Sequence, residues 1–144
     1  MEEEFDKLKT KVLKYVLYKK RTENEIRCKF AEENENMLDD VISYLKEAKY
    51  INDEEYVKKA VKEYMNLKNL SIKELEYKLQ TKGINKNLIS DYIYENKNDL
   101  VEYELKSAET IVNKKRINNE DDETIKLYLL KKGYMEEIIK SVLC

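Results

Sequence analysis

The chain has 144 residues, of which 42% are hydrophobic and 40% are charged, and its formal net charge is −2. This length fits one domain or a few small units packed together, and the apolar fraction is too high for a disordered chain. Proline is absent and glycine occurs only twice, which argues against β-rich and α/β folds because their turns need both residues.

Residues 1–51 predict three helices. Thr22 and Glu25 form a Thr-x-x-Glu capping box, which begins a short middle helix in TENEIRCKF. The helices on either side are predicted from apolar residues at helical spacing. These residues are Phe5, Leu8, Val12, Tyr15 and Val16 in the first helix and Leu38, Val41, Ile42 and Leu45 in the third.

Residues 52–98 repeat this plan. Asn52 and Glu55 make a box-like helix start, and Ser71 and Glu74 make a second capping box. Gly83 follows the last apolar residue of the middle helix, where a left-handed turn costs glycine least. The two flanking stripes are Val57, Ala60, Val61, Tyr64 and Met65, then Leu88, Ile89, Tyr92 and Ile93.

Residues 99–144 repeat it again. Asp121 is the expected N-cap of the middle helix, and Gly133 is its expected end. The flanking stripes are Val101, Leu105, Ala108, Ile111 and Val112, then Ile138, Ile139, Val142 and Leu143.

The three middle helices align with a period of 49–50 residues. Ser71 corresponds to Thr22 and Asp121, and Gly83 corresponds to Gly133 and Asn34. Since asparagine tolerates the left-handed conformation, we expect Asn34 to stop its helix as the glycines do. The pattern predicts an all-α fold of nine helices in three tandem three-helix repeats, 1–51, 52–98 and 99–144, stacked into an elongated, curved, solenoid-like body. One compact irregular bundle is the alternative.

The residue types of common catalytic and metal sites are scarce. The chain has no histidine, no nucleotide-binding or hydrolase motif and no apolar run near the ~18 residues of a membrane span. Cys28 and Cys144 lack metal-ligand spacing, and the acidic start does not read as a signal peptide. We therefore expect a cytoplasmic, non-catalytic protein with no cofactor, no metal and no membrane contact.

Four segments together carry a family resemblance. They are YVLYKKRTENEIRCKF (15–30), YINDEEYVKKAVKEYMN (50–66), IKELEYKLQTKGI (72–84) and LLKKGYMEEIIKSVL (129–143). In this order they resemble the RecX family over nearly the whole chain. The chain departs from the family at Lys49, which stands where glycine is usual, at Asn52 and Val57, and in lacking a Gly-x-x-Arg element before Ser71.

The resemblance implies a regulator that binds the RecA–DNA filament in its helical groove. Such a protein inhibits or modulates the RecA ATPase, strand exchange and co-protease activity in homologous recombination, DNA repair and the SOS response. The implied partner is therefore the RecA nucleoprotein filament. We expect a monomer, with at most a weak contact to single-stranded DNA.

Charge is distributed unevenly along the chain. Residues 7–29 carry nine Lys/Arg against two Glu, residues 31–47 carry six acids against one lysine, and residues 58–86 carry eight lysines against three Glu. This indicates a basic side that contacts an acidic filament surface or phosphates, or else solvated lysines on amphipathic helices. The candidate contacts are Lys19, Lys20, Arg21, Arg27, Lys29, Lys73, Lys78, Lys82, Lys114, Lys115 and Arg116.

Tyrosines divide into two groups. Tyr15, Tyr64 and Tyr92 lie on the apolar stripes and are expected in the core. The others lie off or beside the stripes and are expected to pack between units or contact a partner. They are Tyr18, Tyr77, Tyr103 and Tyr128.

Two other functions compete with the RecA modulator. Capped three-helix units resemble helix-turn-helix domains, so a DNA-binding regulator is one alternative. Against it, the middle helices begin with the acidic sequences TENEI, SIKEL and DDETI, which would face phosphates poorly. The other alternative is an inert helical adaptor for another protein.

Overall fold

The computed structural model describes residues 2–144, and this part of the chain is helical from end to end without a strand. Its nine helices are α1 (Glu2–Tyr18), α2 (Glu23–Lys29), α3 (Glu35–Glu47), α4 (Asp53–Leu67), α5 (Ile72–Thr81), α6 (Lys86–Glu95), α7 (Lys97–Ile117), α8 (Asp122–Lys132) and α9 (Glu136–Leu143). The predicted all-α class is therefore confirmed.

The middle helices begin at the predicted caps. Thr22 and Ser71 each accept a bond from the N3 amide, while Glu25 and Glu74 return to the cap amide. The Asp121 side chain accepts from the Thr124 amide and begins α8 in the same way. These side chains satisfy amides that the first helical turn leaves without partners.

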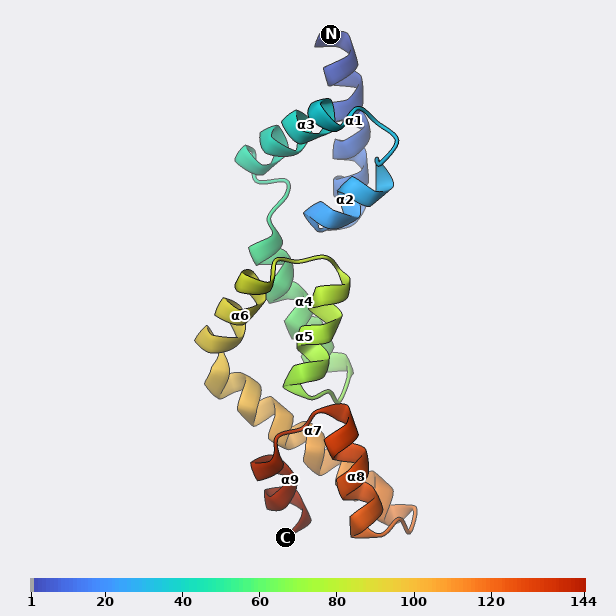
Figure 1. Ribbon diagram of the computed structural model, residues 1–144, viewed down its shortest axis with the longest axis vertical. Coiled ribbons are helices and arrows are strands. Elements are labelled where there is room, and N and C mark those ends of the chain that lie inside the picture. Colours follow the sequence, from blue (N-terminus) through green and yellow to red (C-terminus); the bar gives the residue numbers. More distant parts are fainter. Residues whose placement is uncertain (1) are drawn as a thin grey trace.

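The helices gather around three separate cores that follow one another down the molecule (Figure 1). The molecule exposes 10100 Å², whereas a compact protein of its 17.3 kDa mass exposes about 7,800 Å². This excess surface excludes the compact bundle. Three tandem three-helix units in an elongated body are therefore confirmed.

We propose that the units are bounded as the sequence predicts, at residues 51 and 98. Ile51 is the last member of the first core. Helix α7 begins at Lys97 and its Leu100 packs in the second core, while Ala108 and Val112 pack in the third. The first turns of α7 thus serve both units.

The turns that end the middle helices agree with the prediction at two of three places. Gly83 and Gly133 have φ values of 75° and 89°, in the left-handed region. The prediction for Asn34 is wrong, because its φ is −59° and it caps α3 by accepting from the Met37 amide. Asn34 lies twelve residues after Thr22, while Asn85, the N-cap of α6, lies fourteen after Ser71. The first unit therefore has a shorter middle helix and turn.

The middle helices meet end to end across the unit boundaries. The Thr22 hydroxyl donates to the Lys82 carbonyl over 3.0 Å, and the equivalent Ser71 hydroxyl donates to the Lys132 carbonyl over 2.6 Å. We call these boundaries the first joint, between units one and two, and the second joint, between units two and three. At each joint a helix C-terminus faces a helix N-terminus, so the two helix dipoles attract each other.

Both glycines lie at these joints. A Cβ atom built on Gly83 would lie 2.2–2.4 Å from atoms of Asn24, and one on Gly133 would lie 3.0 Å from the Lys73 Cβ. Asn24 and Lys73 are equivalent residues of the preceding unit, 49 positions apart. The glycines are therefore needed for close contact between units as well as for the left-handed turn. The turn after the middle helix of the first unit contains no glycine.

A carboxylate completes each joint. Asp53 accepts the Glu23 amide over 3.0 Å, and Glu104 accepts the Ile72 amide over 2.8 Å. In both cases the amide is the first of a middle helix, and the carboxylate comes from the first helix of the next unit. Glu104 also accepts the Met135 amide over 3.3 Å and is fully buried.

The tyrosines lie largely where the sequence predicts. Tyr15, Tyr64 and Tyr92 pack against the first and second cores as half-buried side chains. Tyr103 of α7 contacts the preceding unit, since its hydroxyl accepts from the Leu70 amide and donates to the Lys68 carbonyl. Tyr128 packs on the third core, whereas Tyr18 and Tyr77 point into solvent with 87% and 67% of their surface exposed.

Candidate interaction surface

The candidate contact residues lie at the ends of the first helices and along the middle helices. Helices α2, α5 and α8 occupy one side of the elongated body, and α3, α6 and α9 occupy the other (Figure 1). The candidate cations of the middle helices, α2 and α5, therefore lie along one edge of the molecule, although only Lys29 and Lys78 occupy equivalent positions of the repeat. Their availability depends on which of them already have acidic partners within the chain.

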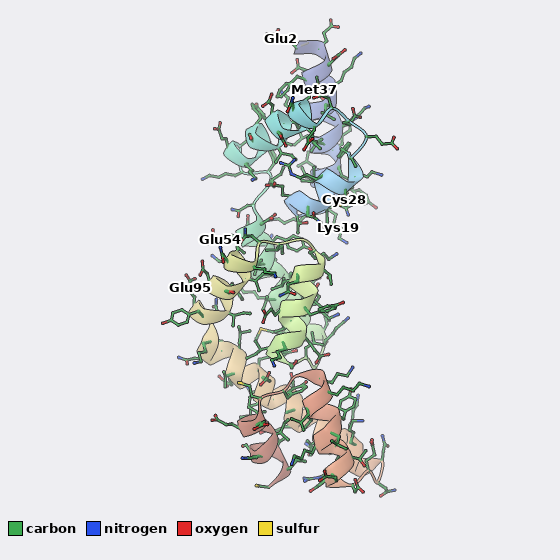
Figure 2. The ribbon with its side chains drawn as sticks, viewed as in Figure 1. Glu2, Lys19, Cys28, Met37, Glu54 and Glu95 are labelled. Atoms are coloured by element: carbon green, nitrogen blue, oxygen red, sulfur yellow. The ribbon has the colours of Figure 1, made fainter. Side chains whose placement is uncertain are left out.

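In the first run, Lys19, Lys20 and Arg21 have different surroundings. Lys19 is exposed near the foot of the first unit (Figure 2). Lys20 lies 3.3 Å from a Glu55 carboxylate oxygen and so bridges to the second unit. Arg21 stacks 4.2 Å from the centre of the Tyr15 ring, with its Nε atom buried and without a hydrogen-bond partner among the described residues. Lys19 is thus the member most open to a partner.

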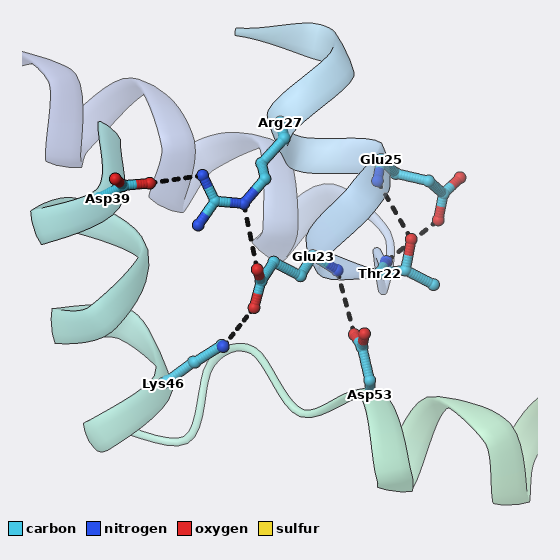
Figure 3. A network of polar contacts seen from close by, with 7 residues as sticks. All are labelled: Thr22, Glu23, Glu25, Arg27, Asp39, Lys46 and Asp53. Carbon is cyan, nitrogen blue, oxygen red and sulfur yellow. Dashed lines mark hydrogen bonds and ion pairs between the residues drawn. The ribbon is translucent and has the colours of Figure 1, made fainter. Parts of the chain in front are cut away.

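Arg27 belongs to a network inside the chain. It donates to Glu23 over 3.0 Å and to Asp39 over 2.5 Å, while Lys46 pairs with the same Glu23 (Figure 3). Hydrogen bonds to Asp39 and Glu23 raise the pKa of Arg27 above its ordinary value. Part of the predicted contrast between a basic and an acidic side therefore cancels within the first unit.

The middle helices carry several exposed lysines as well as one that is paired. Lys29 and Lys73 are exposed, and Lys78 lies 5.6 Å from the centre of the Tyr64 ring. Lys82 is 3.7 Å from Glu25 across the first joint. At the second joint, a shallow cleft of about 420 Å³ between α5 and α8 is lined by Lys73, Lys78, Lys131 and Lys132. These four cations share the cleft with one acid, Glu74, so its lining is positively charged overall.

The run at the end of α7 is mostly paired. Lys115 lies 3.4 Å from Glu120 and 3.9 Å from the centre of the Tyr128 ring. Arg116 makes two hydrogen bonds to Asp122 and a third to the Leu143 carbonyl. Lys114 is exposed, and no acidic group of residues 2–144 lies within 4 Å of it. Only Lys114 of this run offers an uncommitted charge.

The two joints differ in electrostatics. Burial raises the pKa of Glu104, and this effect is larger than the lowering caused by the two amides that donate to its carboxylate. Burial likewise raises the pKa of Asp53. Burial acts in the same direction on Glu23, but hydrogen bonds from Lys46 and Arg27 outweigh it and hold the pKa of Glu23 below its ordinary value. Glu23 is therefore stabilised as an anion, and Glu104 is disfavoured as one.

Sequence reasoning missed the role of the joints and two of the cleft lysines. Lys131 and Lys132 are absent from the predicted contacts, although Lys132 corresponds to Lys82 by the repeat. Extending the offset of 50 to every predicted cation would have found Lys132. One feature of the sequence indicates the close contact between Gly83 and Asn24. Both glycines of the chain occupy the same place in units two and three.

The described residues contain no helix able to cross a membrane and no cluster of ligands suited to a metal ion.

Comparison with known proteins gives consistent relatives. The chain is 30% identical to the regulatory protein RecX of Clostridium beijerinckii, with the match covering 98% of this chain and 68% of the relative. It is 33% identical to the regulatory protein RecX of Finegoldia magna, covering 90% and 67% of the two chains. No protein-family model matches the sequence.

Solved structures share the fold. The crystal structure of RecX from Lactobacillus salivarius superposes with a TM-score of 0.87 at 24% identity, covering 99% of this chain and 96% of that one. A second crystal structure of a regulatory protein RecX gives a TM-score of 0.84 at 21% identity. These structures confirm the fold, and the sequence relatives confirm the predicted family of regulatory proteins. The chain belongs to the RecX family of regulatory proteins.

Proposed function

We propose that this protein binds along the RecA–DNA filament as a monomer and inhibits or modulates RecA ATP hydrolysis, strand exchange and co-protease activity. The supporting observation is the shape of the molecule. Three equivalent units follow one another in an elongated row (Figure 1). Such a row suits a partner that repeats along an axis, as a helical filament does.

The helix-turn-helix alternative is disfavoured by the joints. A recognition helix must present a free N-terminal end to the major groove. Here Thr22 and Ser71 are fully buried, because the ends of α5 and α8 cover the starts of α2 and α5. The start of α8 is open but carries Asp121, Asp122 and Glu123, which repel phosphates.

The proposed function is tested by adding the purified protein to cognate RecA on single-stranded DNA and following ATP hydrolysis. We expect the rate to fall as the protein approaches saturation of the filament. An unchanged rate at severalfold excess over RecA would contradict the proposal. Binding to bare single-stranded DNA, measured beside it, is expected to be weak and strongly salt-dependent.

The basic edge is tested by charge reversal at lysines that have no acidic partner in the structure. The variant Lys19→Glu/Lys73→Glu/Lys114→Glu changes one exposed lysine in each unit. We expect weaker inhibition, with a larger loss at low salt because screening is then smallest. The control is Lys86→Glu/Lys140→Glu, which reverses exposed charges on the opposite edge. The test variant changes the net charge by −6 and the control changes it by −4. A control loss of about two thirds or more of the test loss would mean that net charge matters and the basic edge does not.

A further inference from the structure

The first helix of every unit ends in an exposed apolar side chain. Tyr18, Leu67 and Ile117 are the last residues of α1, α4 and α7. Their side chains are 87%, 75% and 79% exposed. They are 49 and 50 residues apart, like the caps of the middle helices that follow them, whereas the buried valines of the first helices, Val12, Val61 and Val112, are 49 and 51 residues apart.

These side chains have no part in the cores. The buried stripes of the same helices end earlier, at Val16, Val61 and Val112. Single exposed apolar residues are common on protein surfaces and need no explanation by themselves. Three exposed apolar side chains at the ends of the three first helices do need an explanation, because chance exposure would not place one in every unit.

Other exposed apolar residues do not recur in this way. Tyr94 of α6 is 81% exposed, but the corresponding places of α3 and α9, nine residues after the N-cap, hold Ser43 and Cys144. Tyr77 and Leu127 correspond to each other, but the first unit has the small Cys28 at that place. Only the set at the first-helix ends is large and apolar in all three units.

Each apolar residue has a cation beside it. Lys19 follows Tyr18, Lys68 follows Leu67, and Arg116 precedes Ile117. Lys19 and Lys68 are exposed, and neither has an acidic partner within 4 Å in the described chain, whereas Arg116 is already paired with Asp122. A surface that matches the first two units would therefore combine an apolar notch with a carboxylate at its edge.

We propose that Tyr18, Leu67 and Ile117 are three corresponding anchors, which insert into the same apolar notch on successive identical subunits of a helical protein filament. The proposal rests on the proposed function and identifies its contact residues. Leucine and isoleucine favour a protein partner over phosphates. Separation of the anchors by whole units favours a repeating partner over a single continuous patch on a second copy of this chain.

The anchors are tested by serine substitutions, singly and as Tyr18→Ser/Leu67→Ser/Ile117→Ser, with Tyr94→Ser as the matched control. Binding to RecA filaments on single-stranded DNA is measured by co-sedimentation. We expect each single change to weaken binding by about tenfold and the triple change to weaken it by more than a hundredfold. Tyr94→Ser should bind as the unchanged protein does, and melting curves should show that all variants fold.

Isolated RecA subunits without DNA give a second readout. A single subunit offers one notch, which any of the three anchors can fill. Single substitutions should therefore change this binding less than twofold, while the triple variant loses it. The contrast between filament and subunit is specific to three equivalent anchors.

Each other outcome identifies a different fault. If the unchanged protein fails to bind filaments, the proposed function and the anchors fall together. If it binds and the triple variant binds equally well, the anchors alone are wrong. A matching loss of affinity for bare single-stranded DNA would assign these residues to nucleic acid. A dimer of the free protein that disappears in the triple variant would assign them to self-association, and either result would overturn the proposal.

Discussion

The two joints use the same backbone contacts but differ in what surrounds them. At the first joint, Asp53 is half-buried and accepts one amide, beside an open cleft of about 650 Å³. At the second, Glu104 is fully buried and accepts two amides, from α5 and from the start of α9. Glu104 thus connects two helices, whereas Asp53 contacts the start of one.

The segments that connect the units also differ, and the connection at the second joint is the shorter one. Units one and two are linked by the loop 48–52, whereas only Asn96 separates α6 from α7 at the second boundary. Both α5 and α6 pack against α7. We therefore expect the second joint to be the stiffer and the first to be the place where the molecule bends. This comparison leads to four predictions.

The largest effect is expected for the two joint carboxylates. Glu104→Ala leaves two part-buried amides without acceptors and should lower the free energy of unfolding by about 3–4 kcal/mol. Asp53→Ala leaves one amide that water can reach, so about 1 kcal/mol is expected. Urea denaturation of both variants measures the difference. Equal losses would show that the second joint is no more dependent on its acid than the first.

For the two glycines, the larger loss of stability is expected at the first joint. Gly83→Ala places a Cβ atom in contact with Asn24 and should cost about 2–3 kcal/mol, from the left-handed turn and the clash together. Gly133→Ala meets only the edge of Lys73, so about 1–2 kcal/mol is expected. Thermal melting gives both values. In an Asn24→Gly background the cost of Gly83→Ala should fall to that of Gly133→Ala, and an unchanged cost would rule out the clash.

A smaller effect concerns pH. Because the pKa of Glu104 is raised from 4.5, the folded state holds its proton more tightly, so its contribution to stability falls as pH rises from about 4.5 through the folded pKa. The pKa of Glu23 is lowered from 4.5, so its contribution is present above about 4.5 and is lost on acidification. The stability of the unchanged protein relative to Glu104→Gln should therefore fall from pH 4 to 7, while that relative to Glu23→Gln should rise. Slopes of the same sign would refute this assignment.

The smallest expected effect lies in the loop of the first joint. Lys49 has a φ of 66°, in the left-handed region, as does Asn119 at 64° after α7. Lys49→Gly should raise the free energy of unfolding by about 0.5–1 kcal/mol, because glycine adopts this conformation without strain. Asn119→Gly should gain less, since asparagine tolerates it. A larger gain at Asn119 would contradict the strain at Lys49.

Local sequence signals predicted the fold well. Caps at Thr22, Ser71 and Asp121 act over three residues, and Gly83 and Gly133 act within one turn, so each leaves a pattern that can be read along the chain. Asn34 failed because the offset of 49 does not hold across a turn that is two residues shorter in the first unit.

The candidate surface was less predictable, because a cation's availability depends on partners far away in the sequence. Lys20 and Lys82 pair with acids of neighbouring units. Arg27 pairs with Asp39 of another helix. Local charge counts cannot separate these residues from Lys19 or Lys114. The hydrogen bonds of the two joints connect residues about 60 positions apart. The repeated glycine is the one sequence feature that indicates them.

The end-to-end contacts between the middle helices show what a longer array of units would require. A further unit placed after the third would need a hydroxyl donor at the N-cap of α8. Asp121 occupies that position, and its ionised carboxylate is an acceptor that would repel an incoming carbonyl. Adding one before the first requires a glycine turn in place of the Asn34 cap. Asp121→Ser and a Lys-Gly turn would therefore give both ends the chemistry of an internal joint, so that the number of units becomes a design variable.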